Sequence, residues 1–326
     1  MKNQYFGDKR DLFKFDLLLD LMASGKFRQL TYVPMLTPPD STGKEGNQLR
    51  RSAGPFSSEV FDFLRDHRRN PDVRQLRKLF ADRKQFKYSA HRDDAYYSYQ
   101  QRSDYFRTIE SSALRSACVF LDPDIGIERG SAQYMGRSGL DKYLFLDDLE
   151  ALVGRSEESA FIVYQHLQKD AGKRLGDIHG HIEALSNRFG IAAVPFVRQG
   201  DLAFYAVATD EAISAEVAKV FSNHAQKLDR LAQHVTDILF VVKAIFGAGN
   251  ELNDLAVFGS VARGEQGPDS DIDVLASFAG PATLRGFFEL QRSLELFLGR
   301  RIDLVTSKAL RSEMRPAIEQ EALHAA

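Results

Sequence analysis

Near the end of the chain, a Gly-Ser turn is followed by two aspartates spaced as Asp-x-Asp. Gly259 and Ser260 come after one apolar stretch, and Asp271 and Asp273 come at the start of the next. A glycine lets the backbone approach a phosphate closely, and a serine at the start of a helix adds a hydroxyl beside free backbone N–H groups. Residues two apart on a strand point to the same side, so both carboxylates can face one cation. The pattern predicts a site that holds a nucleoside triphosphate against divalent metal ions.

A third aspartate belongs to the same predicted site. Asp303 lies in the apolar stretch 301–305, which reads as a neighbouring strand. Three carboxylates within about 4 Å of one another repel by up to about 4 kcal/mol per pair at an effective dielectric of 20. Divalent cations such as Mg²⁺ relieve this repulsion, and two of them can activate an attacking oxygen and stabilise a pyrophosphate leaving group. The alternative is a helix cap beside a strand of solvated acids, and the third acid on an apolar strand argues against it.

Residues from about 252 to the end of the chain resemble a minimal nucleotidyltransferase domain of the DNA polymerase β superfamily. The family pattern is Gly-Ser-x-Ala-Arg-Gly, then Ser-Asp-x-Asp, then a lone Asp in a strand, and all of it is met. Members of this type often act as antitoxins or defence components that transfer AMP from ATP to a protein tyrosine. The resemblance implies ATP as substrate and two Mg²⁺ ions bound by the catalytic acids Asp271, Asp273 and Asp303. The residues that it implies for nucleotide binding are Gly259, Ser260, Arg263 and Ser270.

The elements that must position this site follow from apolar spacing in the last third of the chain. Strands are predicted at 255–258, 272–275 and 302–306, with a short helix after the first, a helix at 283–298 and a closing helix. Before them, residues 211–246 have an almost continuous helical pattern without proline, closed by glycine and asparagine at 247–250. We therefore predict a small α+β domain at 251–326 with a polymerase-β-like nucleotidyltransferase fold, and a helical connector at 211–250.

The first 210 residues predict a separate α/β domain. A strand is expected at 30–36, and apolar runs at 117–121, 160–164 and 191–197 are typical of buried strands. Alternating strands and helices favour a Rossmann-like, mainly parallel sheet, and 192–197 with 202–208 predicts an antiparallel hairpin at one edge. Helical periodicity is found at 12–22, 57–65, 73–80, 105–114, 146–153 and 174–189.

Polar residues gather at the predicted strand ends of this domain. Asp122 and Asp124 follow the strand at 117–121, and Gln165 and His166 follow the strand at 160–164. Because ligands of open α/β sheets bind outside the carboxyl ends of the strands, these side chains are expected to converge, unless they only cap loops and turns. The charged stretch at the first helix adds three more candidates, Asp8, Asp11 and Lys14.

Some of these residues also resemble motifs of a bacterial 23S rRNA adenine-N6 methyltransferase family. At Asp124 and Ile125 the sequence lacks the second proline and the tyrosine of that family's Asp-Pro-Pro-Tyr motif, and glycines at 43–46 are a poor substitute for its cofactor loop. A nuclease-like or toxin-like site and a degenerate ligand-binding domain therefore stay open as alternatives. The positions that do match are Gly7, Asp11, Lys14, Asp122 and Pro123.

Composition excludes several classes of protein. A formal charge of −2 over 326 residues excludes a globally basic nucleic-acid binder, although it allows a local basic groove. The single cysteine, Cys118, cannot form an internal disulfide or a cysteine-rich zinc site, and its place in an apolar run predicts core packing. The start of the chain lacks the apolar stretch of a signal peptide, and the apolar run near 238–246 is too short to span a bilayer. We therefore expect a cytoplasmic protein with no membrane partner.

The sequence as a whole predicts a Mg²⁺-dependent nucleotidyltransferase that moves AMP, or another NMP, from a nucleoside triphosphate to a hydroxyl of a protein or an RNA. The N-terminal domain would be an effector or the acceptor itself, in a single-chain toxin–antitoxin-like or antiphage module, and a homo-oligomer stays open. The alternative is a nucleotide-sensing module that regulates an N-terminal domain acting on nucleic acid as a nuclease or methyltransferase. The intact acids favour the enzyme.

Overall fold

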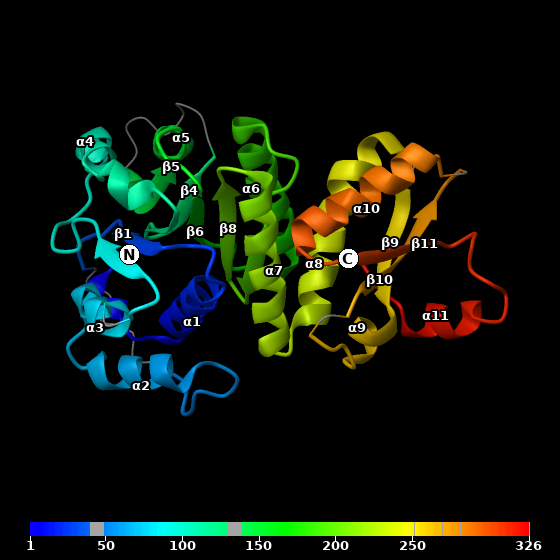
Figure 1. Cartoon of the computed structure of the whole chain (residues 1–326), viewed down its shortest axis with the longest axis horizontal. Helices are drawn as coiled ribbons and strands as arrows, with labels where there is room; N and C mark the ends of the chain where they lie inside the picture. Colours follow the sequence, from blue (N-terminus) through cyan, green and yellow to red (C-terminus); the bar gives the residue numbers. More distant parts are fainter. Residues whose placement is uncertain are drawn as a thin grey trace. The chain divides into compact units, whose positions relative to one another are not determined.

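The computed structural model of the chain describes residues 1–39, 49–81, 83–129, 139–250, 252–268, 270–280 and 282–325 (Figure 1). The chain divides into two compact units. The first comprises Met1–Leu167, Asn187–Gly190 and Arg198–Ser214, and the second Gln168–Ser186, Ile191–Val197 and Ala215–Ala326. The domain limits 1–210, 211–250 and 251–326 stay a prediction.

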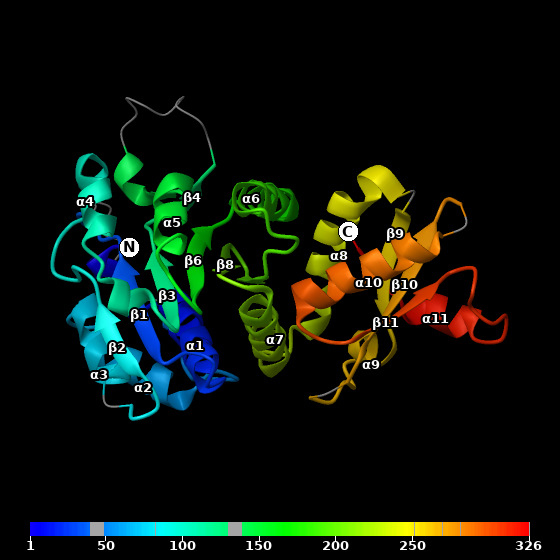
Figure 2. The ribbon, with the colours of Figure 1, turned by 45° about the horizontal axis from the view of Figure 1, so that its top comes forward.

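A six-stranded sheet forms the centre of the N-terminal part of the chain, with the order β2-β1-β3-β6-β8-β7. β1 pairs in parallel with β2 and β3, and β3 with β6, whereas β6 and β8 are antiparallel (Figure 2). Every residue of β1 and β3 is buried, which explains why these strands are nearly continuous apolar runs. The predicted α/β class is confirmed. The strands are β1 (Gln29–Pro34), β2 (Lys87–Ala90), β3 (Ala117–Asp122), β6 (Ala160–His166), β7 (Phe196–Gln199) and β8 (Leu202–Ala208).

Helix α1 (Lys9–Ala23) begins where Asp8 caps it. The Asp8 carboxylate accepts hydrogen bonds from the backbone N–H groups of Arg10 and Asp11 at 2.7 and 3.0 Å. The other helices of this region are α2 (Ser58–His67), α3 (Leu76–Phe80), α4 (Arg102–Arg107), α5 (Leu146–Val153) and α6 (Arg174–Phe189). A separate parallel pair consists of β4 (Gly126–Glu128) and β5 (Tyr143–Phe145). Short 3₁₀ helices lie at Asn3–Tyr5, Val73–Gln75, Tyr99–Gln101, Ser111–Leu114, Leu140–Lys142 and Ala171–Lys173.

Two of the predicted elements are shorter than expected. The strand predicted at 191–197 begins only at Phe196, because Pro195 has no N–H to donate to a strand ladder. The helix predicted at 105–114 ends at Arg107. The Thr108 hydroxyl donates to the carbonyl of Asp104 at 3.0 Å, which competes with continuation of the helix, and a 3₁₀ turn follows.

The predicted continuous helix at 211–246 consists of two helices, α7 (Glu211–Lys227) and α8 (Leu231–Asn250). Asp229 between them has a φ of 56°. The backbone N–H of Arg230 donates to the carbonyl of Ala225 at 2.8 Å, which closes α7. No helix in the described ranges combines the length and the apolarity needed to cross a membrane.

A four-stranded sheet in the second unit has the order β11-β10-β9-β12. β9 is antiparallel to β10 and β12, and β10 is parallel to β11. Helix α8 packs against β9, and α10 packs against α8 and β11. The predicted strands and the helix at 283–298 are present, and β12 is an addition. The elements are β9 (Leu252–Phe258), α9 (Gly259–Arg263), β10 (Ile272–Phe278), α10 (Leu284–Leu298), β11 (Ile302–Thr306), α11 (Arg315–Glu321) and β12 (Leu323–His324).

Candidate functional site

The three acids singled out in the sequence lie at one end of the second sheet. Asp273 on β10 is the register partner of Asp303 on β11, and Asp271 immediately precedes β10. Residues two apart on an extended chain face the same way, and register partners on neighbouring strands lie side by side, so the three carboxylates share one face. Burial raises the pKa of the Asp273 carboxyl, and the negative charges of Asp303 and Asp271 raise it further. The cluster therefore carries negative charge that a cation would neutralise.

The turn at Gly259 lies directly against this cluster. The preceding residue, Phe258, is the register partner of Asp273. Gly259 has a φ of +68°, and a Cβ built on it would lie 2.2 Å from Oδ2 of Asp273. The position therefore requires glycine both for its backbone conformation and for space. A phosphate bound at this turn would lie beside any cation that the acids hold.

The two predicted serines have different surroundings. Ser260 is the second residue of α9 and is half-buried, and its carbonyl accepts a hydrogen bond from the backbone N–H of Glu265 at 2.8 Å. The Ser270 hydroxyl accepts a hydrogen bond from the backbone N–H of Gly267 at 2.8 Å. Ser270 thus closes the loop that leads into Asp271, while Ser260 stands next to the Gly259 turn.

Arg263 is held by two acidic side chains. Its Nε donates to Glu265 at 2.7 Å, and its Nη1 donates to Oε2 of Glu321 at 2.8 Å. The other carboxylate oxygen of Glu321, Oε1, accepts the backbone N–H of Gly259 at 2.8 Å. No motif in the sequence marks Glu321, the last residue of α11, because only tertiary structure brings the closing helix to the Gly259 turn.

The sheet, the Gly-Ser turn and the three acids together define a nucleotidyltransferase domain, and residues 235–324 match the family model described as "Nucleotidyltransferase domain". The chain is 38% identical over 73 residues to the protein adenylyltransferase MntA of Thermococcus cleftensis, which covers 22% of this chain and 74% of that protein. It is 35% identical over 91 residues to MJ0128 of Methanocaldococcus jannaschii, provisionally named a protein adenylyltransferase, which covers 28% of this chain and 93% of that protein. The chain belongs to this family of nucleotidyltransferases.

Two solved structures are also similar to the C-terminal part. One, provisionally described as a minimal nucleotidyltransferase, is 34% identical, covers 28% of this chain and 89% of that chain, and has a TM-score of 0.25. Another, a toxin–antitoxin with AMP-PNP, is 22% identical, covers 26% of this chain and 70% of that chain, and has a TM-score of 0.24. Because these TM-scores are low, the two structural similarities add nothing to what the sequence matches show.

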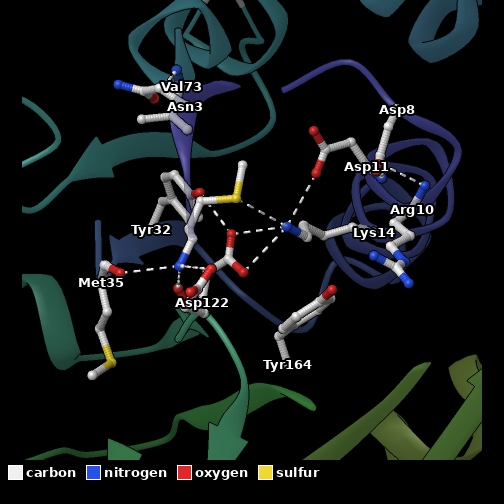
Figure 3. Close-up of polar contacts among 12 residues, drawn as sticks. Asn3, Asp8, Arg10, Asp11, Lys14, Tyr32, Met35, Val73, Asp122 and Tyr164 are labelled. Carbon is white, nitrogen blue, oxygen red and sulfur yellow. Dashed lines mark hydrogen bonds and ion pairs between the residues drawn. The ribbon is translucent and has the colours of Figure 1, made fainter. Parts of the chain in front are cut away.

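A buried ion cluster lies at the carboxyl end of β3 in the first unit (Figure 3). The Lys14 ammonium donates to the two carboxylate oxygens of Asp122 at 2.9 and 3.1 Å and lies 3.1 Å from Asp11. The Tyr32 hydroxyl donates to Asp122 at 2.8 Å, and Lys14 Nζ lies 4.6 Å from the centroid of the Tyr164 ring. Burial by itself would lower the pKa of Lys14, but the carboxylates of Asp122 and Asp11 raise it, so Lys14 stays charged.

Further polar residues surround this cluster. Arg10 pairs with Asp201 at 2.6 Å, and Asp124 lies 3.7 Å from the Lys2 ammonium. The Tyr164 hydroxyl and His166 Nε2 are 2.9 Å apart. The structure thus brings together six of the seven residues that the sequence indicated in this domain. A cavity of about 50 Å³ is lined by these six, namely Asp8, Asp11, Lys14, Asp122, Asp124 and His166, together with Met1, Lys2, Tyr5, Arg10, Pro123 and Tyr164.

Gln165 has a different role from the one expected. Its Oε1 accepts the backbone N–H of Ile127 at 2.7 Å, and its Nε2 donates to the carbonyl of His166 at 2.6 Å. A Cβ on Gly126 would lie 2.1 Å from Gln165 Oε1, so the amide is packed tightly against β4. Both ends of the Gln165 amide bind backbone, and the side chain does not line the cavity.

The resemblance to adenine-N6 methyltransferases is not supported. The matched Asp122 has its carboxylate oxygens occupied by Lys14 and Tyr32, and the matched Asp11 lies in the same ion cluster. The glycines at 43–46, considered as a cofactor loop, lie outside the described residues.

Removal of the Lys14 charge is expected to destabilise the first unit strongly. Lys14→Met keeps the length of the side chain but leaves the buried Asp122 and Asp11 without their cation, and breaking a buried pair in this way costs about 3–5 kcal/mol. Denaturant unfolding of the full chain measures the loss. Lys9→Met, exposed on the same helix, is the control and is expected to change the free energy of unfolding by less than about 0.5 kcal/mol. Equal unfolding midpoints for the two variants would contradict this account.

His166 is expected to stay neutral well into the acid range. Burial, with a smaller contribution from the positive charge of Arg10, lowers the pKa of His166 to about 4. Since the folded pKa lies below the unfolded one, His166 stabilises the fold above pH 6.5 and loses this contribution, up to about 3 kcal/mol, as the pH falls towards 4. An NMR titration of the His166 ring proton tests this, and a midpoint near 6.5 would show that the ring is solvated.

Proposed function

We propose that the C-terminal domain transfers AMP from ATP to a hydroxyl group of a protein, with release of pyrophosphate. The observation that carries the proposal is the register of the second sheet, which sets Asp273 beside Asp303 and against the Gly259 turn. The relatives named as protein adenylyltransferases support AMP as the transferred group and protein as the acceptor. Transfer of another nucleotide, or transfer to an RNA hydroxyl, would use the same chemistry.

The donor set fits a divalent cation. Three carboxylates share one face, and burial together with the negative charges of Asp303 and Asp271 raises the pKa of Asp273. Carboxylate oxygens together with substrate phosphates are the ligands that Mg²⁺ prefers. Asp271 and Asp273 would hold two ions between them, and Asp303 would complete the site of one. When bound, the ions neutralise phosphate charge and polarise the α-phosphate.

The residues of the chain account for the remaining parts of the reaction. The Gly259 N–H and the Ser260 hydroxyl bind phosphate oxygens, which orients the triphosphate along the turn. The acceptor oxygen attacks the α-phosphorus, the bond from that phosphorus to the bridging oxygen breaks, and pyrophosphate leaves with the bonding electrons. The proton of the acceptor hydroxyl passes to the Asp303 carboxylate and then to solvent.

Incubation of the full chain with ATP labelled in the α-phosphate or the adenine, in the presence of Mg²⁺, tests this function. We expect label on this chain or on a copurifying protein that survives denaturation, and no label with Asp271→Asn/Asp273→Asn. Reversible binding of ATP without covalent label would instead favour a nucleotide-sensing module.

We further propose that the N-terminal part of the chain is the effector, or the acceptor, that the transferase domain controls. The buried cluster of Lys14, Asp122 and Asp11 with its cavity supports a ligand site at the carboxyl end of β3, where Rossmann-like sheets bind ligands. A toxin–antitoxin-like or antiphage module in one chain is the biological setting that this implies. The test is toxicity on expression. The double variant Asp271→Asn/Asp273→Asn is expected to be toxic, because its transferase domain is inactive. Adding Asp122→Ala to this double variant is expected to remove the toxicity. Normal growth of cells that express the double variant would contradict the proposal.

A further inference from the structure

The Glu321 carboxylate binds the donors of the Gly259 turn that a nucleotide would need. One oxygen accepts the backbone N–H of Gly259 at 2.8 Å, and the other accepts Nη1 of Arg263 at 2.8 Å. A carboxylate that bridges a backbone N–H and a guanidinium occupies the place of two phosphate oxygens. We propose that Glu321 is a built-in occupant of the phosphate subsite, and that a nucleoside triphosphate binds by displacing it. The inference rests on the proposed function of this site.

Backbone pairing fixes where Glu321 lies. β12 is antiparallel to β9, with Leu323 opposite Val257 and His324 opposite Ala256. Continuing this register by two residues sets Glu321 opposite Gly259, so strand pairing delivers the carboxylate to the N–H of the turn. Glu321 is the C-terminal residue of α11, and it is its side-chain carboxylate that accepts the Gly259 N–H.

The helix that carries Glu321 is short, so displacement of the carboxylate at its end is feasible. α11 has seven residues and β12 has two, and helices this short have little stability of their own. Ile318 is the buried residue of α11, and the Arg315 guanidinium donates to the carbonyl of Ser307 at 2.7 Å. The Glu321 side chain is 24% exposed, which lets solvent and ions reach the contact.

Charge makes the two occupants exclude each other. Glu321 adds negative charge to the cluster of acids, and it is among the groups that raise the pKa of Asp273. Arg263 and the Gly259 N–H lower the pKa of Glu321, so its carboxylate is ionised at neutral pH. A triphosphate brings several more negative charges to the same donors, and these donors cannot bind Glu321 and the triphosphate at the same time. Binding of the nucleotide therefore frees Arg263 from Glu321 and makes it available to phosphate.

The test is nucleotide binding by full-length variants. Glu321→Gln keeps an oxygen acceptor for the Gly259 N–H but removes the charge, and Glu321→Ala removes both contacts. Glu319→Gln, on the same helix and paired with Arg315 at 3.4 Å, is the matched control. Titration calorimetry with Mg²⁺ and a non-hydrolysable ATP analogue, and separately with inorganic triphosphate, gives the Kd of each protein. Thermal unfolding confirms that each variant is folded.

We expect both Glu321 variants to bind the analogue and triphosphate about tenfold more tightly than the wild type, which is the size of one charge-assisted contact. The control is expected to keep the wild-type Kd, and adenosine without phosphates is expected to bind all four proteins alike. Variants that bind the analogue equally or more weakly would show that Glu321 only braces the turn, and would overturn the inference. If the wild type still labels protein with AMP in that case, the proposed function stands. If no protein binds the analogue or triphosphate, both fail.

Discussion

Asp273→Asn is expected to lower nucleotidyl transfer by about 10³-fold, the upper end of what loss of one electrostatic contact to a transition state costs. Asp273 is the acid that joins the two parts of the site. It is the register partner of Asp303, and its Oδ2 is the atom nearest to where a Cβ of Gly259 would lie. Covalent labelling with ATP measures the loss. More than a tenth of wild-type transfer remaining would show that the three acids are not the reaction centre.

The same substitution is expected to leave the metal-free fold as stable as the wild type, or more stable. The folded-state pKa of Asp273 is raised, so the carboxyl favours the fold when protonated and disfavours it once ionised at neutral pH. Asparagine removes the negative charge of Asp273, and with it the repulsion from the neighbouring acids, and it keeps the shape of the side chain. Added Mg²⁺ is expected to raise the Tm of the wild type and not that of Asp273→Asn, because the variant lacks one of the three proposed ligands of the ion.

Asp254 provides a matched control in the same sheet. It lies on β9 and pairs with Lys243 at 3.0 Å and His324 at 2.5 Å, so it belongs to a different cluster from the three acids. Asp254→Asn is expected to keep transfer within about twofold of the wild type and to lose up to about 1 kcal/mol of stability. A loss of transfer equal to that of Asp273→Asn would point to a general effect on the domain.

Gly259→Ala is expected to reduce transfer by about 10²-fold, the scale of a displacement of about 1 Å at a reacting centre. The added Cβ would lie 2.2 Å from Asp273 Oδ2, so either the turn or the carboxylate must move. A non-glycine residue in the left-handed region costs a further 1–2 kcal/mol or so of stability. Transfer kinetics and thermal unfolding separate the two effects.

Gly264→Ala separates the clash from the backbone strain. Gly264 has a φ of +72°, similar to that of Gly259, and nothing lies within 4 Å of the Cβ position. We expect it to lose the same 1–2 kcal/mol or so of stability while transfer stays within about threefold of the wild type. If both alanine variants lose transfer equally, the contact between the turn and Asp273 is not what the site requires.

Local patterns in the sequence were sufficient to locate most of the elements. The Asp-x-Asp spacing predicts two carboxylates on one face of a strand whatever that strand pairs with, because side chains alternate along any strand. The strand at 302–306 was predicted with the bounds that it has. The break at Asp229 and the late start of β7 at Phe196 were missed, because helical and strand periodicity continue through both positions while a single backbone conformation or a missing N–H interrupts the element.

Part of the candidate site in the first unit could likewise be predicted from the sequence, and part of it could not. Asp122 and His166 were expected to converge because both follow predicted parallel strands, and the structure places them on one cavity. Gln165, adjacent to His166, could not be separated from it by sequence, since only the fold places Gly126 and Ile127 against its amide. The buried Lys14–Asp122 pair likewise joins residues 108 positions apart.

The sequence by itself determined the kind of chemistry at the C-terminal site, because glycine, serine and paired aspartates at this spacing suit phosphates and divalent cations. Tertiary structure decided how those residues meet. The parallel register of β10 and β11 sets Asp303 beside Asp273, and the pairing of β12 with β9 brings Glu321 to the Gly259 N–H. Strand register depends on contacts between distant segments, so the spacing of residues along one segment cannot specify it.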